Sequence, residues 1–219
     1  MAVKENLIEI NSKISKSCTQ SGRKVDDVTF VAVSKFQDDG KIDEALSAGL
    51  RVFGENRVQE AESHWAERRA TYPDLQLHLI GPLQSNKARD AVSLFDVIET
   101  IDRDSIAEAI AKECSKQNKN PICLIQVNTG NEEQKAGVSL NDLPALIQKC
   151  QGLKLNIQGL MCIPPVNEPA AFHFALLKKL AARYNLPLLS MGMSADFEKA
   201  IKVGATHIRI GSALFGERP

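Results

Sequence analysis

Short apolar segments recur along the chain at a steady interval, and each has the length of a β-strand. They are rich in β-branched residues and contain few polar ones, which is typical of strands buried on both faces of a parallel sheet. The eight segments are VTFVAV (28–33), LRVFG (50–54), LQLHLIG (75–81), FDVIETI (95–101), ICLIQVN (122–128), LNIQGLMCI (155–163), LPLLSMG (186–192) and THIRIG (206–211).

Segments with helical periodicity separate these strands. After the first strand, for example, apolar residues at helical spacing over 42–46 predict an amphipathic helix, and Gly49 is placed to end it. Comparable patterns follow the second to seventh strands, and one more, over residues 7–18, precedes the first strand. The chain therefore alternates strand and helix along its length.

This alternation predicts an α/β fold, and the simplest arrangement is a (β/α)8 barrel with an extra N-terminal helix. A doubly wound open sheet is the alternative, but it would more naturally have five or six strands, and no GxGxxG follows the first strand. Only SALFGERP follows the eighth strand. We therefore expect one domain over residues 1–219 and no second domain.

Composition narrows the range of partners. The chain has 219 residues, with 27 basic and 27 acidic side chains, and no long run of one sign. Nucleic acid and anionic membranes are therefore not expected as partners, and any bound anion must be caught by a local arrangement. The first residues contain no apolar signal-peptide core, and no stretch approaches the roughly 20 apolar residues of a membrane span. These features predict a cytoplasmic protein.

The five cysteines do not point to a disulfide framework or a metal centre. They are Cys18, Cys114, Cys123, Cys150 and Cys162, and no two of them form a CxxC pair. Their odd number and scattered spacing favour reduced thiols. We predict no metal site.

Polar residues at the carboxyl ends of the strands are the candidates for chemistry, because active sites of such barrels form there. Lys35 ends the first strand, and it shares a face with Val33. In the eighth strand Arg209 alternates with Ile208 and Ile210, so isoleucines packed on helices would direct Arg209 into the barrel. The first and eighth strands of a closed barrel are neighbours. Lys35 and Arg209 would then approach each other near the barrel mouth.

A lysine in that position has two interpretations. It can extend from the strand end into water with its charge intact. Alternatively, repulsion from Arg209 and partial desolvation favour the neutral amine, which is a nucleophile. Further residues at the strand ends support the second interpretation.

Two loops could grip a phosphate group. In MGMSADFEKA (191–200), Ser194 is placed to start the helix that follows the seventh strand, although a serine N-cap is common without any ligand. In RIGSALFG (209–216), Gly211 allows a close backbone approach and Ser212 can start a short helix. Phosphate sites made by the loops after strands seven and eight recur in barrels of this kind.

A nucleophilic lysine and a phosphate grip together suggest a phosphorylated aldehyde as ligand. Pyridoxal phosphate fits, because a lysine forms a Schiff base with it and the phosphate anchors its other end. A Schiff-base aldolase acting on a sugar phosphate also fits. Arg209 favours pyridoxal phosphate, since an inward arginine between the two anchors can face the pyridine nitrogen.

At this point the residues match a known pattern. VAVSK, FGEN, HLIGPLQSNK (78–87), GLM (159–161), MGMSADFEKAI and RIGSALFG together resemble the pyridoxal phosphate homeostasis proteins. These are single-domain relatives of the alanine racemase N-terminal barrel. The resemblance extends over residues 28–216 and rests on several motifs in order.

The resemblance implies a role for each matching position. Lys35 would carry pyridoxal phosphate as a Schiff base, and Arg209 would face the pyridine nitrogen. The remaining implied cofactor-binding residues are Asn56 near the ring, Ser194, Gly211 and Ser212 at the phosphate, and His78 and Met161, whose roles the motifs leave open. His78 also has the alternative interpretation of a hydrogen-bonded core histidine.

These residues are compatible with three functions. The resemblance implies a non-enzymatic pyridoxal phosphate carrier that limits the free aldehyde and releases it to apo-enzymes, with amino acids as possible exchange partners. The alternative is a racemase-like enzyme of low activity, but racemisation needs an acid or base on each face of the substrate. In alanine racemases a tyrosine from an extra domain supplies the second base, and Tyr72 and Tyr184 are poorly placed for this. A cofactor-free aldolase is the third. We expect a monomer.

Overall fold

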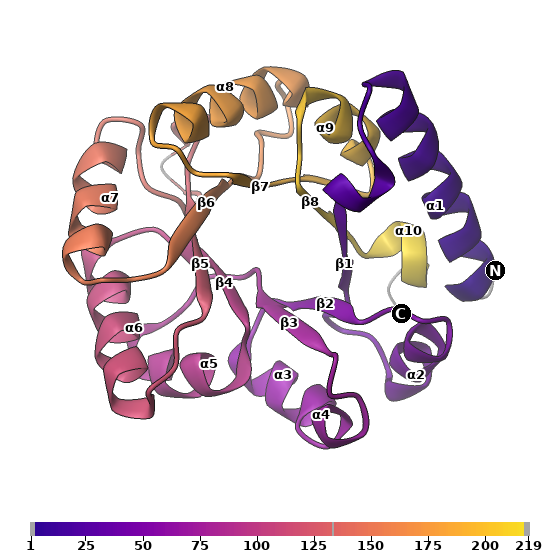
Figure 1. The fold of residues 1–219 in the computed structure, drawn as a ribbon, viewed down its shortest axis with the longest axis horizontal. Helices are drawn as coiled ribbons and strands as arrows, with labels where there is room; N and C mark the ends of the chain where they lie inside the picture. Colours follow the sequence, from indigo (N-terminus) through magenta and orange to yellow (C-terminus); the bar gives the residue numbers. More distant parts are fainter. Residues whose placement is uncertain (1–2, 133, 217–219) are drawn as a thin grey trace.

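Eight parallel strands close into a barrel, and helices surround it (Figure 1). In the computed structural model each strand pairs with its neighbours in sequence, and β8 pairs back with β1. The structure describes residues 3–132 and 134–216. Glu217, Arg218 and Pro219 of the segment after the eighth strand lie outside the described residues. The predicted (β/α)8 barrel is confirmed.

Each of the eight predicted apolar segments overlaps one observed strand, with ends that differ by no more than two residues. The strands are β1 (Thr29–Val33), β2 (Val52–Glu55), β3 (Gln76–Leu79), β4 (Val97–Ile101), β5 (Ile122–Gln126), β6 (Ile157–Met161), β7 (Leu188–Met193) and β8 (His207–Ile210). Their apolar, β-branched sequences suit a sheet that is covered on its outer face and filled on its inner face.

The helices form the outer layer and include the predicted N-terminal one. They are α1 (Val3–Gln20), α2 (Asp39–Ser47), α3 (Val58–Trp65), α4 (Arg68–Thr71), α5 (Ala88–Leu94), α6 (Asp104–Gln117), α7 (Leu143–Gly152), α8 (Ala170–Arg183), α9 (Phe197–Val203) and α10 (Ser212–Phe215), with 3₁₀ turns η1 (Val25–Asp27) and η2 (Ser85–Lys87). Gly49, with a positive φ of 94°, follows the end of α2 as expected.

Helix α1 lies along the outside of the barrel beside α9 and α10 (Figure 1). Its apolar stripe, which includes Leu7, Ile10 and Ile14, is buried against these helices. Each such side chain contributes about 2 kcal/mol when it is fully buried. Asn6 Nδ2 also donates a hydrogen bond of 2.8 Å to the Leu214 carbonyl oxygen. The extra helix therefore fastens the last helix, α10, in place next to the barrel mouth.

The strands divide their side chains between two cores. Ile208 and Ile210 belong to the large apolar core between sheet and helices, whereas Arg209 points into the barrel. This confirms the alternation expected for the eighth strand. Inside the barrel, Met161 packs with Val97 in a small apolar cluster. Buried polar side chains also lie in the interior, among them His78, Glu99 and Arg209.

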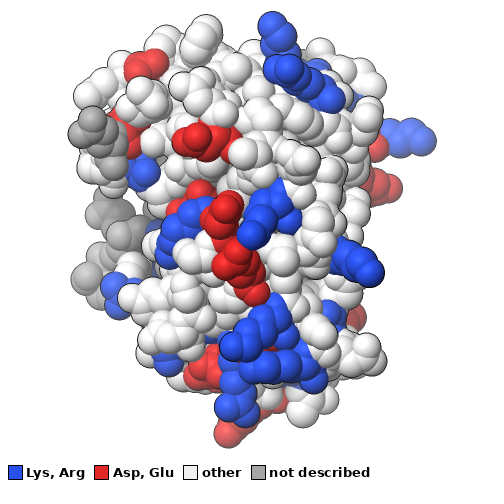
Figure 2. Space-filling model, turned by 90° about the vertical axis from the view of Figure 1, so that its left-hand side faces the viewer, with Lys and Arg blue, Asp and Glu red and all other residues white. Residues whose placement is uncertain are grey.

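The surface carries charges of both signs. On the face that includes α6 and α7, basic and acidic side chains lie close together rather than forming an extended patch of one sign (Figure 2). Lys149 of α7 and Glu108 of α6, for example, form an ion pair of 2.6 Å. Among the described helices, none combines the length and the apolar character required to cross a membrane.

Candidate functional site

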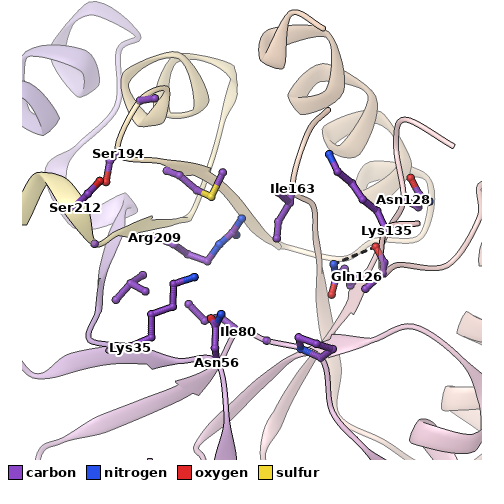
Figure 3. A pocket seen from close by; sticks show the side chains of 17 residues that line it. Lys35, Asn56, Ile80, Gln126, Asn128, Lys135, Ile163, Ser194, Arg209 and Ser212 are labelled. Carbon is purple, nitrogen blue, oxygen red and sulfur yellow. Dashed lines mark hydrogen bonds between the residues drawn. The ribbon is translucent and has the colours of Figure 1, made fainter. Parts of the chain in front are cut away.

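A pocket of about 520 Å³ opens at the carboxyl end of the barrel (Figure 3). Its volume lies in the usual range for small-molecule sites. Six of the eight predicted cofactor-binding residues line it, namely Lys35, Asn56, Ser194, Arg209, Gly211 and Ser212. They come from the ends of β1, β2, β7 and β8, which the closed barrel brings together although they are far apart in sequence.

Lys35 follows β1 by two residues and extends into the pocket (Figure 3). Both of its neighbours are anchored. The Ser34 hydroxyl donates a 2.7 Å hydrogen bond to Glu55 Oε1, and the Phe36 backbone N–H donates to Glu60 Oε1. Phe36 has a left-handed φ of 61°, which is rare for a residue with a bulky side chain. Two carboxylates thus hold the turn that presents Lys35.

A buried cluster supports this turn from behind. Glu55 is fully buried, and its Oε1 atom also accepts a hydrogen bond of 3.0 Å from Trp65 Nε1. His64 Nδ1 lies 3.2 Å from the same oxygen, and this hydrogen bond raises the pKa of His64, although partial burial acts in the opposite direction. Glu55, Glu60 and His64 each have a side-chain atom of a kind that can ligate a metal ion, and these atoms lie within 4.8 Å of one another. Their hydrogen bonds to Ser34 and Phe36 link this cluster to Lys35.

Arg209 is almost completely buried, with 4% of its surface exposed. Its Nη1 atom donates a 2.5 Å hydrogen bond to Ser190 Oγ, and its Nη2 atom donates a 2.8 Å hydrogen bond to the Cys162 carbonyl oxygen. Arg209 Nη1 lies 3.9 Å from Glu99 Oε2. Side-chain alternation predicted Lys35 as the charged neighbour of Arg209. The structure adds a buried carboxylate that offsets the charge of the guanidinium.

Glu99 is the central acceptor of the barrel interior. Burial would raise the pKa of Glu99, but the 2.7 Å hydrogen bond from His78 Nδ1 and the positive charge of Arg209 outweigh it and lower the pKa to about 2. Burial also lowers the pKa of His207 to about 4. The interior therefore combines an ionised Glu99, a cationic Arg209 and a neutral His207.

The loops after β7 and β8 meet at the other end of the pocket. Ser194 Oγ accepts a hydrogen bond of 3.3 Å from the Ala213 backbone N–H and so joins the two loops. Helix α10 begins at Ser212, as predicted. Helix α9, however, begins at Phe197 and has Asp196 at its N-cap, so the expectation that Ser194 starts this helix was wrong. The Ser194 side chain lines the pocket instead.

A third wall of the pocket comes from the loop after β5. The Gln126 amide donates to the Ala136 carbonyl oxygen at 3.2 Å, and Asn128 Nδ2 donates to the Glu132 carbonyl oxygen at 2.8 Å. Lys135 of this loop also lines the pocket and forms a 2.6 Å ion pair with Glu132. Gln126 and Asn128 could be suspected from their positions at a strand end. Lys135 lies in a long loop, where no sequence pattern identifies it.

His78 and Met161 do not line the pocket. His78 is 1% exposed and hydrogen-bonded to Glu99, which agrees with the alternative interpretation of a core histidine. Met161 is fully buried in the apolar cluster with Val97 and Leu124. Their place in recurring motifs indicated a role at the site, but it did not show that both side chains are buried inside the barrel. The assignment of these two residues to cofactor binding stays a prediction.

Comparisons with known proteins agree with this architecture. The family model described as the alanine racemase N-terminal domain matches residues 12–219. A pyridoxal phosphate homeostasis protein from Pseudomonas aeruginosa is 42% identical over 222 residues, covering 99% of this chain and 96% of the relative. The protein of that name from Escherichia coli is 37% identical, covering 99% of this chain and 97% of the relative.

Solved structures give the same result. PipY from Synechococcus elongatus, in its form without pyridoxal phosphate, has a TM-score of 0.86 and 38% identity, and the match covers 98% of this chain and 100% of PipY. Its form with pyridoxal phosphate bound has a TM-score of 0.84 and 37% identity, with the same coverage. A histidine racemase from Leuconostoc mesenteroides shares the fold at 18% identity and a TM-score of 0.70, and the match covers 99% of this chain but 57% of the racemase. The chain thus belongs to the family of pyridoxal phosphate homeostasis proteins.

Proposed function

We propose that this protein binds pyridoxal phosphate covalently, as a Schiff base on Lys35 Nζ, and acts in its intracellular homeostasis. It would store the cofactor, buffer the free aldehyde and deliver the cofactor to apo-enzymes. The observation that carries the proposal is the gathering of Lys35, Arg209 and the Ser194 and Ser212 loops around one pocket. A close relative of the same fold has a structure with pyridoxal phosphate bound.

The residues present suit this cofactor. A pocket of about 520 Å³ accommodates a single substituted ring with its phosphate. The lysine amine supplies the attachment point for the aldehyde, and the loops of Ser194, Gly211 and Ser212 offer hydroxyl and backbone N–H donors for the phosphate. Asn56 also lines the pocket and is the proposed neighbour of the ring.

The presence of Arg209 favours a protein that carries the cofactor over an enzyme that uses it. Pyridoxal phosphate supplies an electron-accepting ring when it is bound, and protonation of the ring nitrogen strengthens that property. Arginine can only donate, so a ring nitrogen that faces Arg209 stays an unprotonated acceptor. Hydrogen bonds to Ser190 and Cys162 hold the guanidinium in this orientation. The site is therefore better suited to holding the cofactor than to carbanion chemistry.

The racemase alternative has less support. Among the described residues that line the pocket there is no tyrosine. Tyr72 and Tyr184 follow the last residues of α4 and α8, and Tyr72 packs against Arg51. In a (β/α)8 barrel the helices end at the face opposite the active site. We therefore expect no appreciable turnover when L- or D-alanine is added to the cofactor-loaded protein.

The visible absorption spectrum tests the proposal. We expect the wild-type protein mixed with pyridoxal phosphate to be yellow, and borohydride reduction followed by peptide mass spectrometry to place the label on Lys35. Lys35→Ala should lose both signals. Lys135→Ala is the matched control, because Lys135 also lines the pocket, and it should keep both. A colourless wild type, or a label that is absent from Lys35, would overturn the assignment.

Delivery needs a separate measurement. The labelled cofactor should pass from the loaded protein to an apo-enzyme faster than from Lys35→Ala mixed with the same amount of cofactor. Added amino acids should accelerate the release, because a second amine can replace the lysine. Monomeric state and cytoplasmic location stay predictions, which size-exclusion chromatography and cell fractionation would check.

A further inference from the structure

A second hollow lies beside the cofactor pocket and shares two of its residues, Asn56 and Pro82. Its volume is about 610 Å³. Its walls come from the turn after Lys35, from the start of α3, from η2 and from the start of α6. The proposed cofactor grip uses none of the cationic side chains in this hollow.

The lining of this hollow is strongly positive. It includes Arg57, Lys87 and Arg103 but no carboxylate, in a chain whose net charge is zero. Arg103 is paired with Asp102 at 2.6 Å, whereas Lys87 Nζ lies 3.9 Å from Asp90. Within the described ranges, 3–132 and 134–216, Arg57 forms no ion pair and no side-chain hydrogen bond. The hollow thus has more positive charge than its surroundings neutralise.

The backbone adds to this positive potential. Arg57 and Arg103 are the N-cap residues of α3 and α6, and neither side chain makes a capping hydrogen bond. A cation at a helix N-terminus is unfavourable, because it meets the positive end of the helix dipole. A bound anion would remove this repulsion and would accept hydrogen bonds from the same cations. The arrangement therefore favours an anionic ligand with more than one negative charge.

The remaining walls suit a planar group. Phe36 lies at the edge of the hollow with 49% of its surface exposed, and its left-handed backbone conformation is held by Glu60. Gln59 and Gln84 place amide groups in the lining. An aromatic ring presented in this way stacks on bases, and amides can bond to base edges. Gln84 and Lys87 belong to the HLIGPLQSNK motif, and the proposed cofactor grip assigns no role to these two residues.

We propose that this hollow is a nucleotide-binding site, with the phosphates on Arg57, Lys87 and Arg103 and the base against Phe36. A hollow of about 610 Å³ suits a small molecule better than an extended acidic segment of a partner protein. The site is separate from the attachment point at Lys35. Because Asn56 and Pro82 belong to both pockets, nucleotide binding is placed to influence how the cofactor is held.

Isothermal titration of the cofactor-loaded protein with ADP tests this site. We expect saturable binding that weakens as salt is added. Arg57→Gln and Lys87→Gln should each weaken ADP binding at least tenfold. Lys112→Gln is the matched control, because it makes the same charge change at an exposed position of α6 outside the hollow, and it should bind like wild type. Visible spectra of these three variants should stay unchanged, which separates this site from the cofactor pocket.

Two further probes divide the ligand into its parts. Phe36→Ala should weaken ADP binding but leave pyrophosphate binding intact, whereas the two cation variants should weaken both. The proposal is overturned if ADP does not bind, if all variants bind it equally, or if it binds only after pyridoxal phosphate has been removed. Binding of polyglutamate without binding of ADP would overturn it in favour of an acidic protein partner.

Discussion

Arg209 Nη1 and Glu99 Oε2 lie 3.9 Å apart inside the barrel, and the hydroxyl of Ser190 bridges them. The hydroxyl accepts from Arg209 and donates to Glu99, each at 2.5 Å. This pairing lets a guanidinium sit at the floor of the pocket with almost no contact with water. The carboxylate thus balances the charge of Arg209 and, through Ser190, orients the group that is proposed to face the cofactor ring.

Replacing Glu99→Gln should therefore damage both stability and cofactor binding. The variant keeps the shape of the side chain but leaves the charge of Arg209 buried without a counter-charge, which costs about 3 kcal/mol. We expect the free energy of unfolding in urea to fall by this amount. We also expect bound pyridoxal phosphate to be lost faster during gel filtration.

Ser190→Ala is the comparison for this variant. It removes the bridge but keeps both charges, so the loss should be about 1 kcal/mol. Equal stability of Glu99→Gln and the wild type would mean that Arg209 does not depend on this carboxylate.

The turn that presents Lys35 gives a second prediction. Glu60→Ala removes the acceptor of the Phe36 N–H, so the left-handed turn loses one of its two anchors. Lys35 should then sample more orientations, and the rate at which the cofactor band appears should fall several-fold. The measurement is stopped-flow absorbance after mixing with pyridoxal phosphate.

Glu62→Ala is the matched control, since Glu62 lies in the same helix with an exposed side chain. Phe36→Gly in the Glu60→Ala background should restore part of the rate, because glycine adopts a positive φ without strain. Loading rates that do not differ between the two alanine variants would show that the Glu60 contact is irrelevant to Lys35.

Much of this site could be predicted because two simple regularities determine it. Side-chain alternation placed Lys35 and Arg209 on inward faces, and the order of strands in a barrel made β1 and β8 neighbours. Both inferences need only local pattern and topology. The same reasoning located the Ser212 loop, since β8 ends one residue before Gly211.

Other features depend on contacts across the barrel, which local pattern does not encode. Glu99 lies on β4, opposite Arg209, and their pairing appears only after closure. The carboxylate in the middle of FDVIETI was nevertheless a sign, because a charged residue in a buried strand needs a partner. The start of α9 was misjudged for a different reason. Serine and aspartate are both favourable at an N-cap, and in the structure the N-cap of α9 is Asp196, not Ser194.

Acid should destabilise the protein through the barrel interior. The pKa of His207 is about 4 in the folded state and 6.5 in the unfolded chain, because burial disfavours the charged ring. The unfolded chain therefore binds the proton first, and stability is lost as the pH falls from 6.5 towards 4, by up to about 3 kcal/mol. Below pH 4.5, protonation of Glu99 removes more.

Urea unfolding across this range should show this loss, and His207→Asn should flatten it. His64 should act in the opposite direction, because its pKa is raised in the folded state. Its stabilising contribution is complete below pH 6.5 and is lost as the pH rises through the folded-state pKa. Stability that is independent of pH between 4 and 6.5 in the wild type would contradict the assignment of a neutral, partly buried His207.

Gly81 provides the last prediction, because it shows how tightly the pocket wall is packed. A Cβ atom at this position would lie 2.3 Å from the Asn56 backbone oxygen, and backbone cannot rotate away as a side chain can. Gly81→Ala should therefore displace Asn56 from the pocket and lower the free energy of unfolding by about 2 kcal/mol. The affinity for pyridoxal phosphate should fall with it.

Gly152→Ala serves as the control, because a Cβ there meets open space at the end of α7, and the extra methyl should stabilise the helix by about 0.5 kcal/mol. Denaturant unfolding and cofactor titration of the two variants measure both effects. If Gly81→Ala matches Gly152→Ala in both, the pocket wall is adaptable and Asn56 is not held in place by this close backbone contact.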